Sequence, residues 1–91
     1  MTELILPSHV DIDVAHDIKA AGMTAAGEGL TLIADQVATL SCAALQTIIA
    51  VNRHLAASDK VLTLEEPSPP FVAAFEGLGF VEEFNKMKVE S

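Results

Sequence analysis

The stretch LTLIADQVATLSCAALQTIIAVNRHLAA, residues 30–57, decides the fold. It opens with a nearly continuous apolar run, Leu30 to Ala34, which is typical of a strand covered on both faces and therefore central in a sheet. A short connection follows, and Ser41 then supplies a good N-cap for a helix. The apolar positions of that helix recur every three to four residues: Leu45, Ile48, Ile49 and Leu55, with Asn52 in the same row. The stretch predicts a buried strand, then an amphipathic helix that ends near Ala57.

The residues before this stretch predict an edge strand and a first helix. The apolar run at 4–6 is stopped by Pro7, which cannot donate to a sheet ladder, so an edge position is expected. Asp11 or Asp13 then caps a helix over roughly 13–22. Its apolar repeat is Val14, Ile18 and Ala21, and its end and the flexible connection after it are assigned to Gly22, Gly27 and Gly29.

The residues after this stretch predict a second buried strand at 61–64 and a third helix. Ser68 is the expected cap of that helix and Pro69 its first residue. Its apolar stripe is Phe71, Ala74, Phe75 and Leu78, and Gly79 closes it. Residues 80–91 form an amphipathic tail whose structure the pattern leaves open, with Val81 and Phe84 able to dock on the core.

The alternation of strands and helices predicts the fold class. The chain of 91 residues is long enough for one domain, residues 1–91, and its hydrophobic fraction of 51% is enough for a core. The expected fold is α/β, with a mixed, largely parallel β-sheet and packed helices.

The charge of the chain limits its partners. The formal net charge is −8, with five Lys and Arg residues in total. Nucleic acid and anionic membrane surfaces are bound by neutralising their charge, so neither is an expected partner. The lone cysteine, Cys42, excludes an intramolecular disulfide, and no leader or spanning segment is visible. The sequence therefore favours a cytoplasmic protein that binds another protein and does not insert into a membrane.

No group of residues supports catalysis, and no cofactor is expected. There is no glycine-rich phosphate loop and no Ser-His-Asp or Cys-His arrangement. The three histidines, His9, His16 and His54, lack metal-ligand spacing to one another and to Cys42, so no metal site is expected. The acidic pairs 65–66 and 82–83 are expected to be solvated. We therefore do not expect an enzyme.

Two segments resemble the STAS domain family, which includes bacterial anti-sigma factor antagonists, relatives next to chemotaxis genes, and a small subunit of phospholipid-transport ABC systems. The first is the strand–loop–helix segment LIADQVATLSCAAL, residues 32–45. The second is PSPPFVAAFEGLG, residues 67–79, which is similar to the final helix of the family with its Pro-Ser start and Leu-Gly end. The resemblance implies a STAS-like fold over nearly the whole chain and a role in binding other proteins.

The resemblance also implies a phospho-acceptor position, and this chain departs from the family there. In switching members a Ser or Thr near the start of the second helix is phosphorylated, and here that position holds Cys42. Ser41 and Ile33 stand where many members carry Asp. A thiol is not an ordinary kinase substrate, so the switch is in doubt, and Ser41 and Thr39 remain as displaced acceptors.

The expected docking surface is the N-terminal corner of the second helix, and two classes of partner remain open. In a signalling role the partner would be an anti-sigma factor, a histidine kinase or a chemotaxis component. In the alternative the chain would be a cytoplasmic accessory subunit that docks on an ABC ATPase. The partner-binding residues assigned to this corner are Thr39, Leu40, Ser41, Cys42 and Ala44.

Overall fold

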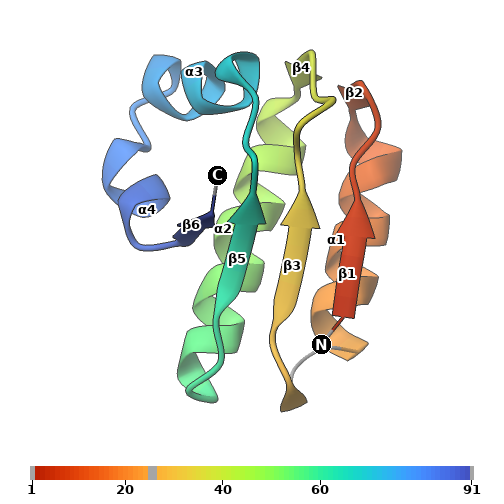
Figure 1. The fold of residues 1–91 in the computed structure, drawn as a ribbon, viewed down its shortest axis with the longest axis vertical. Coiled ribbons are helices and arrows are strands. Elements are labelled where there is room, and N and C mark those ends of the chain that lie inside the picture. Colours follow the sequence, from red (N-terminus) through yellow and green to blue (C-terminus); the bar gives the residue numbers. More distant parts are fainter. Residues whose placement is uncertain (1, 25–26, 91) are drawn as a thin grey trace.

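Four strands form the main sheet, in the order β1-β3-β5-β6 (Figure 1). The structure is a computed structural model that describes residues 2–24 and 27–90. All pairings among the strands that it describes are parallel, within the α/β class that the sequence predicts. The strands of the main sheet are β1 (Thr2–Ile5), β3 (Leu30–Ile33), β5 (Leu62–Glu65) and β6 (Lys88–Glu90).

The central place of β3 is confirmed, but helices cover only one face of it. β3 pairs with β1 on one side and with β5 on the other. Leu32 and Leu64 are fully buried in the core that the sheet shares with helices α1 (Ile12–Thr24) and α2 (Cys42–Ala57), and both helices lie behind the sheet in Figure 1. Because successive strand residues point to opposite faces, Thr31 and Ile33 lie on the face away from these helices. Thr31 is nevertheless buried, because Glu3 and Thr63 flank it on the neighbouring strands.

Helix α1 begins at the expected cap and ends later than expected. Asp11 is the cap, because its Oδ1 accepts hydrogen bonds from the backbone N–H groups of Asp13 and Val14, at 3.1 and 3.2 Å. Gly22 does not end the helix, which continues to Thr24. Gly22 is buried against α2: a Cβ at this position would lie 2.7 Å from Val51 Cγ1. The glycine therefore allows α1 and α2 to pack closely.

Helix α2 matches the prediction at both ends. The Ser41 hydroxyl accepts a hydrogen bond from the backbone N–H of Ala44 at 3.1 Å, as an N-cap does. The helix ends at Ala57, and Ser58 is its C-cap. The apolar row that the sequence assigns to this helix is buried, including Asn52.

Helix α3 (Pro69–Gly77) carries the two largest buried side chains of the described residues. The backbone N–H of Phe71 donates to the Ser68 hydroxyl at 3.3 Å, and Phe71 and Phe75 are fully buried with ring centroids 5.4 Å apart. The prediction for Leu78 is wrong. Leu78 is the C-cap and is 47% exposed, because the helix ends before its side chain can turn onto the core.

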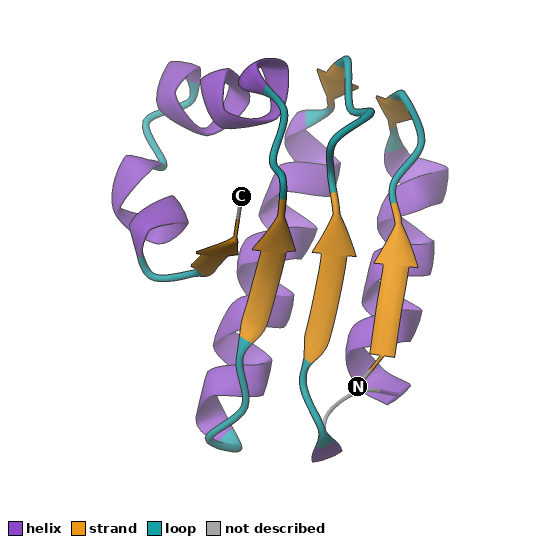
Figure 2. Cartoon of the chain, viewed as in Figure 1, coloured by secondary structure: helices purple, strands orange, loops and turns teal. Residues whose placement is uncertain are grey.

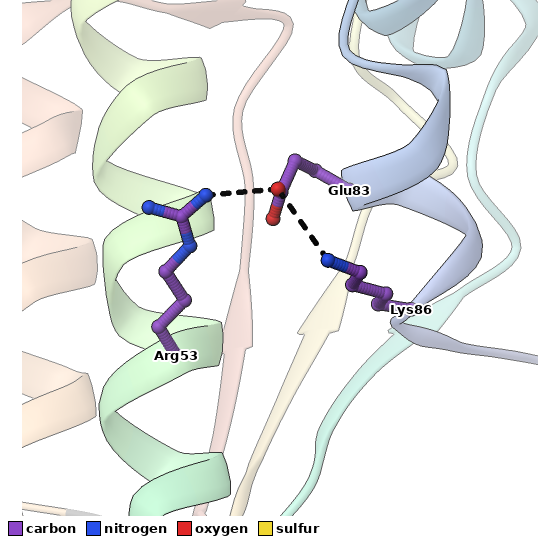
Figure 3. A network of polar contacts seen from close by, with 3 residues as sticks. All are labelled: Arg53, Glu83 and Lys86. Carbon is purple, nitrogen blue, oxygen red and sulfur yellow. Dashed lines mark hydrogen bonds and ion pairs between the residues drawn. The ribbon is translucent and has the colours of Figure 1, made fainter.

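The C-terminal tail is part of the domain. It contains α4 (Val81–Asn85) and β6, which extends the sheet beside β5 (Figure 2). The Phe84 ring lies 5.4 Å from the Phe75 ring, so Phe84 docks as expected. Val81 is 43% exposed and does not dock as expected, whereas Met87 is buried. Arg53 of α2 also contacts Glu83 of α4 at 2.8 Å (Figure 3).

Candidate functional site

A second, two-stranded sheet forms at the carboxyl ends of β1 and β3. It pairs β2 (His9–Val10) with β4 (Thr39–Leu40) in parallel (Figure 1). The side chains also meet, because His9 Nδ1 lies 2.9 Å from Thr39 Oγ1. This small sheet joins the segment after β1 to the segment that leads into α2.

Backbone hydrogen bonds hold the connection from β3 to α2 on its β2 side. The carbonyl of Ser8 accepts from the N–H groups of Ala38 and Thr39, at 2.7 and 3.0 Å. The N–H of Ser41 donates to the carbonyl of Val10 at 2.9 Å. The backbone is therefore fixed up to the residue that caps α2.

The start of α3 holds the same connection from the other side. The buried hydroxyl of Ser68 donates to the carbonyl of Val37 at 2.6 Å, and the Ser68 N–H donates to the carbonyl of Ala34 at 3.1 Å. Ser68 also caps α3, so a single residue positions the helix and the loop that precedes α2. Segments near residues 8, 37–41 and 68 thus form one fixed unit.

The structure brings four of the five predicted partner-binding residues to the surface. Thr39 and Cys42 are exposed, while Leu40 and Ser41 are half-buried. We refer to these four residues, 39–42, as the docking corner. Ala44 does not belong to it: its side chain is fully buried in the core, because it lies on the face of α2 that meets the sheet.

The three groups considered as phospho-acceptors differ in their surroundings. The Ser41 hydroxyl is occupied as the cap of α2. The Thr39 hydroxyl is exposed and shares a hydrogen bond with His9. Cys42 is a free, exposed thiol in the first turn of α2.

The other groups that the sequence singles out are not among the four residues of the docking corner. His16 and His54 are exposed on α1 and α2, and the described residues contain no group of three potential metal ligands. Ile33 is half-buried at the end of β3. No helix within residues 2–24 and 27–90 is both long enough and apolar enough to cross a membrane.

The acidic pair 82–83 is not simply solvated as expected. The carboxylate of Glu83 accepts a hydrogen bond from Arg53 and lies 3.8 Å from the Lys86 ammonium (Figure 3). The hydrogen bond from Arg53 lowers the pKa of Glu83, while partial desolvation opposes that shift. This contact ties α4 to α2.

Sequence reasoning missed His9 and the two short strands. A strand of two residues has too few positions for an alternating pattern, so periodicity cannot reveal it. The available signal was indirect. The segment after Pro7 continues from β1, and the segment before α2 continues from β3, so two segments that follow paired parallel strands could pair with each other. His9 was considered only as a metal ligand.

Comparison with known proteins identifies the fold. No protein-family model matches the sequence, and no curated protein matches it. The chain is similar to the crystal structure of a Thermotoga maritima protein described as a putative anti-sigma factor antagonist. The TM-score is 0.73, the match covers 98% of this chain and 79% of that chain, and the sequences are 16% identical. The fold is STAS-like.

The STAS-like fold gives the docking corner a definite setting. The corner follows the central strand β3, precedes the cap of α2 and is braced by β2 and by the start of α3. Its two sides come from segments more than 25 residues away in the sequence, so its shape depends on the complete fold. The corner is thus a surface segment whose connection to the fold is held by hydrogen bonds on both sides.

Proposed function

We propose that this chain is a non-catalytic protein-interaction module that binds a partner protein through the docking corner. The observation that carries the proposal is that residues 39–42 lie at the surface while the connection that contains them is held by Ser8 and Val10 on one side and by Ser68 on the other. A surface that is already ordered loses little conformational freedom when it binds, which favours association. Leu40 and Cys42 offer small or half-buried apolar contacts at its centre.

The resemblance to STAS proteins supports a role in bacterial signalling. The similar Thermotoga maritima structure is described as a putative anti-sigma factor antagonist. In this role the partner of the present chain is an anti-sigma factor, a histidine kinase or a chemotaxis component. The net charge of −8 favours a partner that is neutral or basic where it meets the acidic parts of this chain's surface.

One observation, the presence of Cys42 at the phospho-acceptor position, favours a second function. A thiol at the phospho-acceptor position suits a constitutive contact better than one released by phosphorylation. The chain would then be an accessory subunit that docks on the ATPase of a lipid-transport ABC system. Gene neighbourhood separates the two roles: sigma-factor or chemotaxis genes support the first, and permease and ATPase genes support the second.

The test introduces charge into the docking corner. Leu40→Glu and Cys42→Asp are each used as bait in a pull-down from the native organism, with the wild-type chain as reference and mass spectrometry as readout. Val61→Glu is the matched control, because Val61 is an exposed apolar residue just before β5, at the opposite end of the sheet. Circular dichroism establishes that each variant is folded.

We expect the wild-type chain and Val61→Glu to retain the same protein, and Leu40→Glu and Cys42→Asp to lose it. If both folded corner variants retain the partner at the wild-type level, the partner binds elsewhere and the proposal fails. Calorimetry with the purified partner then gives the affinity lost at each position.

A further inference from the structure

Helices α1 and α2 leave a groove between them on the side that faces solvent. The two helices touch where Gly22 meets Val51, and the groove above this contact has a volume of about 540 Å³. Residues of α2 border it over a longer stretch than residues of α1, which border it near the contact. Its lining residues are Lys19, Gly22 and Met23 of α1 together with Ala43, Gln46, Thr47, Ala50, Val51 and His54 of α2.

The shape of the groove follows from the size of its residues. Gly22 has no side chain, and Ala43 and Ala50 have only a methyl group, so these residues leave open space between the two helices. Met23 is 62% exposed and forms an apolar wall on α1. From Ala43 to His54 the groove extends about 16 Å at 1.5 Å per helical residue. This length accommodates about three turns of another helix.

The charge of the groove differs from that of the chain. The chain has 13 Asp and Glu residues, yet none of the described residues that line the groove is Asp or Glu. Lys19 lines it and forms no ion pair with any residue that the structure describes. By contrast, Arg53 and Lys86 both contact Glu83, and Lys88 contacts Glu90. The groove therefore carries an uncompensated positive charge.

Four polar side chains line the groove, Lys19, Gln46, Thr47 and His54, and two of them, Lys19 and His54, are nitrogen donors on opposite sides of the helix contact. Gly22 lies opposite Val51, and Lys19 precedes Gly22 by about one helical turn. His54 follows Val51 by about one turn and offers an imidazole N–H. The two donors are therefore about two turns apart, which corresponds to residues i and i+7 of a helix lying in the groove.

We propose that the groove between α1 and α2 binds an acidic amphipathic helix of the partner protein. Small or apolar side chains of that helix contact Gly22, Ala50 and Met23, and two carboxylates, seven residues apart, accept from Lys19 and His54. Binding of an amphipathic helix in an apolar groove is a common mode of protein recognition. The inference rests on the proposed function, since the groove begins at Ala43, the residue next to the docking corner, and one partner can cover both.

The test uses designed peptides, so it does not depend on the identity of the natural partner. The probe is a stapled 14-residue helix with Ala and Leu on one face and Glu at positions i and i+7. Two further peptides carry Gln or Lys at the same positions. Affinities are measured by fluorescence anisotropy against the full chain, and the bound site is mapped from amide chemical shifts in NMR spectra.

The Lys19→Glu variant of the chain reverses the charge of one lining residue of the groove. We expect the Glu peptide to bind, to shift the amide signals of Gly22 and Ala50, and to lose about fivefold in affinity against Lys19→Glu. The Lys peptide is expected to show the opposite preference. Lys60→Glu makes the same charge change at an exposed residue outside the groove and should leave both affinities unchanged.

A filled groove provides a second, uncharged test. Ala50→Leu should abolish binding of the Glu peptide, while Ala56→Leu, on an exposed part of α2 outside the lining, should not. The proposal is overturned if the Glu peptide does not bind, or binds the wild-type and Lys19→Glu chains equally. A dimer of the chain alone that disappears in Lys19→Glu, measured by light scattering, would also overturn it by assigning the groove to a second copy. If the Glu peptide does not bind the wild-type chain while the pull-down still captures the partner, this inference is refuted and the proposed function stands.

Discussion

At the scale of single residues, Cys42 determines what chemistry the start of α2 supports. Its thiol is exposed in the first turn, whereas the neighbouring Ser41 hydroxyl is committed to capping the helix. The Ser41 hydroxyl is half-buried and already accepts from the N–H of Ala44, so a kinase reaches it less readily than the exposed groups of Thr39 and Cys42. The geometry therefore disfavours Ser41 as a substitute acceptor.

The first prediction concerns phosphorylation. We expect no phosphate on Cys42 and little or none on Ser41 or Thr39 when the wild-type chain is incubated with its cognate kinase and ATP, measured by intact mass. Cys42→Ser restores a hydroxyl at the exposed position and should gain one phosphate. A stoichiometric gain on Thr39 in the wild-type chain would instead mean that the acceptor has moved to that residue.

The second prediction concerns Gly22. Gly22→Ala gains about 1 kcal/mol of helix propensity but forces a Cβ into the stiff, buried side chain of Val51, so we expect a net loss of about 1 kcal/mol in the free energy of unfolding. In the Val51→Ala background the same change should become neutral or stabilising. Gly77→Ala is the control, because a Cβ there meets nothing within 4 Å. If urea unfolding shows that Gly22→Ala stabilises the wild-type chain as Gly77→Ala does, the two helices are not in close contact.

At the scale of elements, α3 and α4 close one side of the core. The rings of Phe71, Phe75 and Phe84 form a chain of aromatic contacts with spacings of 5.4 Å. The first two rings are fully buried, and the third brings α4 against α3. Because the chain has only four aromatic residues, these contacts have few substitutes.

The third prediction tests this aromatic contact. Phe71→Ala and Phe75→Ala should each lower the free energy of unfolding by about 3–5 kcal/mol, through lost burial and the cavity left behind. Leu78→Ala is the comparison, since Leu78 is exposed and its replacement should cost less than about 0.5 kcal/mol. Urea unfolding that moves by less than about 1 kcal/mol for both phenylalanine variants would contradict the packing of α3.

The fourth prediction concerns the contact between α2 and α4. The pKa of Glu83 is lowered in the folded state, chiefly by the hydrogen bond from Arg53, so the ionised carboxylate stabilises the fold. This contribution is fully present above the ordinary glutamate pKa of about 4.3 and is lost as the pH falls through the lowered pKa of the folded state. The difference in urea midpoint between the wild-type chain and Glu83→Gln should therefore be present at neutral pH and shrink in acid. Glu82→Gln, which removes a carboxylate from an exposed neighbouring residue, is the matched control.

At the scale of the whole molecule, the pattern of apolar residues predicted the elements that have a regular apolar repeat over many residues or a clear cap. The start of α2 at Ser41 and that of α3 at Ser68 were predictable because each cap residue precedes a regular apolar repeat. The edge place of β1 followed from the signal at Pro7, and the central place of β3 from its strand-length apolar run. The class of the fold was therefore accessible from the sequence.

The remaining features depend on contacts between distant residues. Gly22 was interpreted as a helix end because the sequence does not show that Val51 lies against it. Ala44 was assigned to the surface because a small residue fits either side of a helix, and here it meets the core. The braces from Ser8 and Ser68 are backbone contacts that no residue pattern announces. The surface position of residues 39–42 was predictable, and the contacts that hold the connection around them were not.

The parallel pairing of the strands also determines the order in which the chain can fold. Leu4 pairs with Leu32 and Leu32 with Leu64, so the partners are 28 and 32 residues apart in the sequence. Strands paired in this way cannot begin as a local hairpin, and each pairing must first close a loop that contains a helix. During synthesis the partner of β3 on its β5 side is absent until about residue 65 has left the ribosome. Folding should therefore be slow relative to a helical bundle of the same length, and begin with the helices rather than with the sheet.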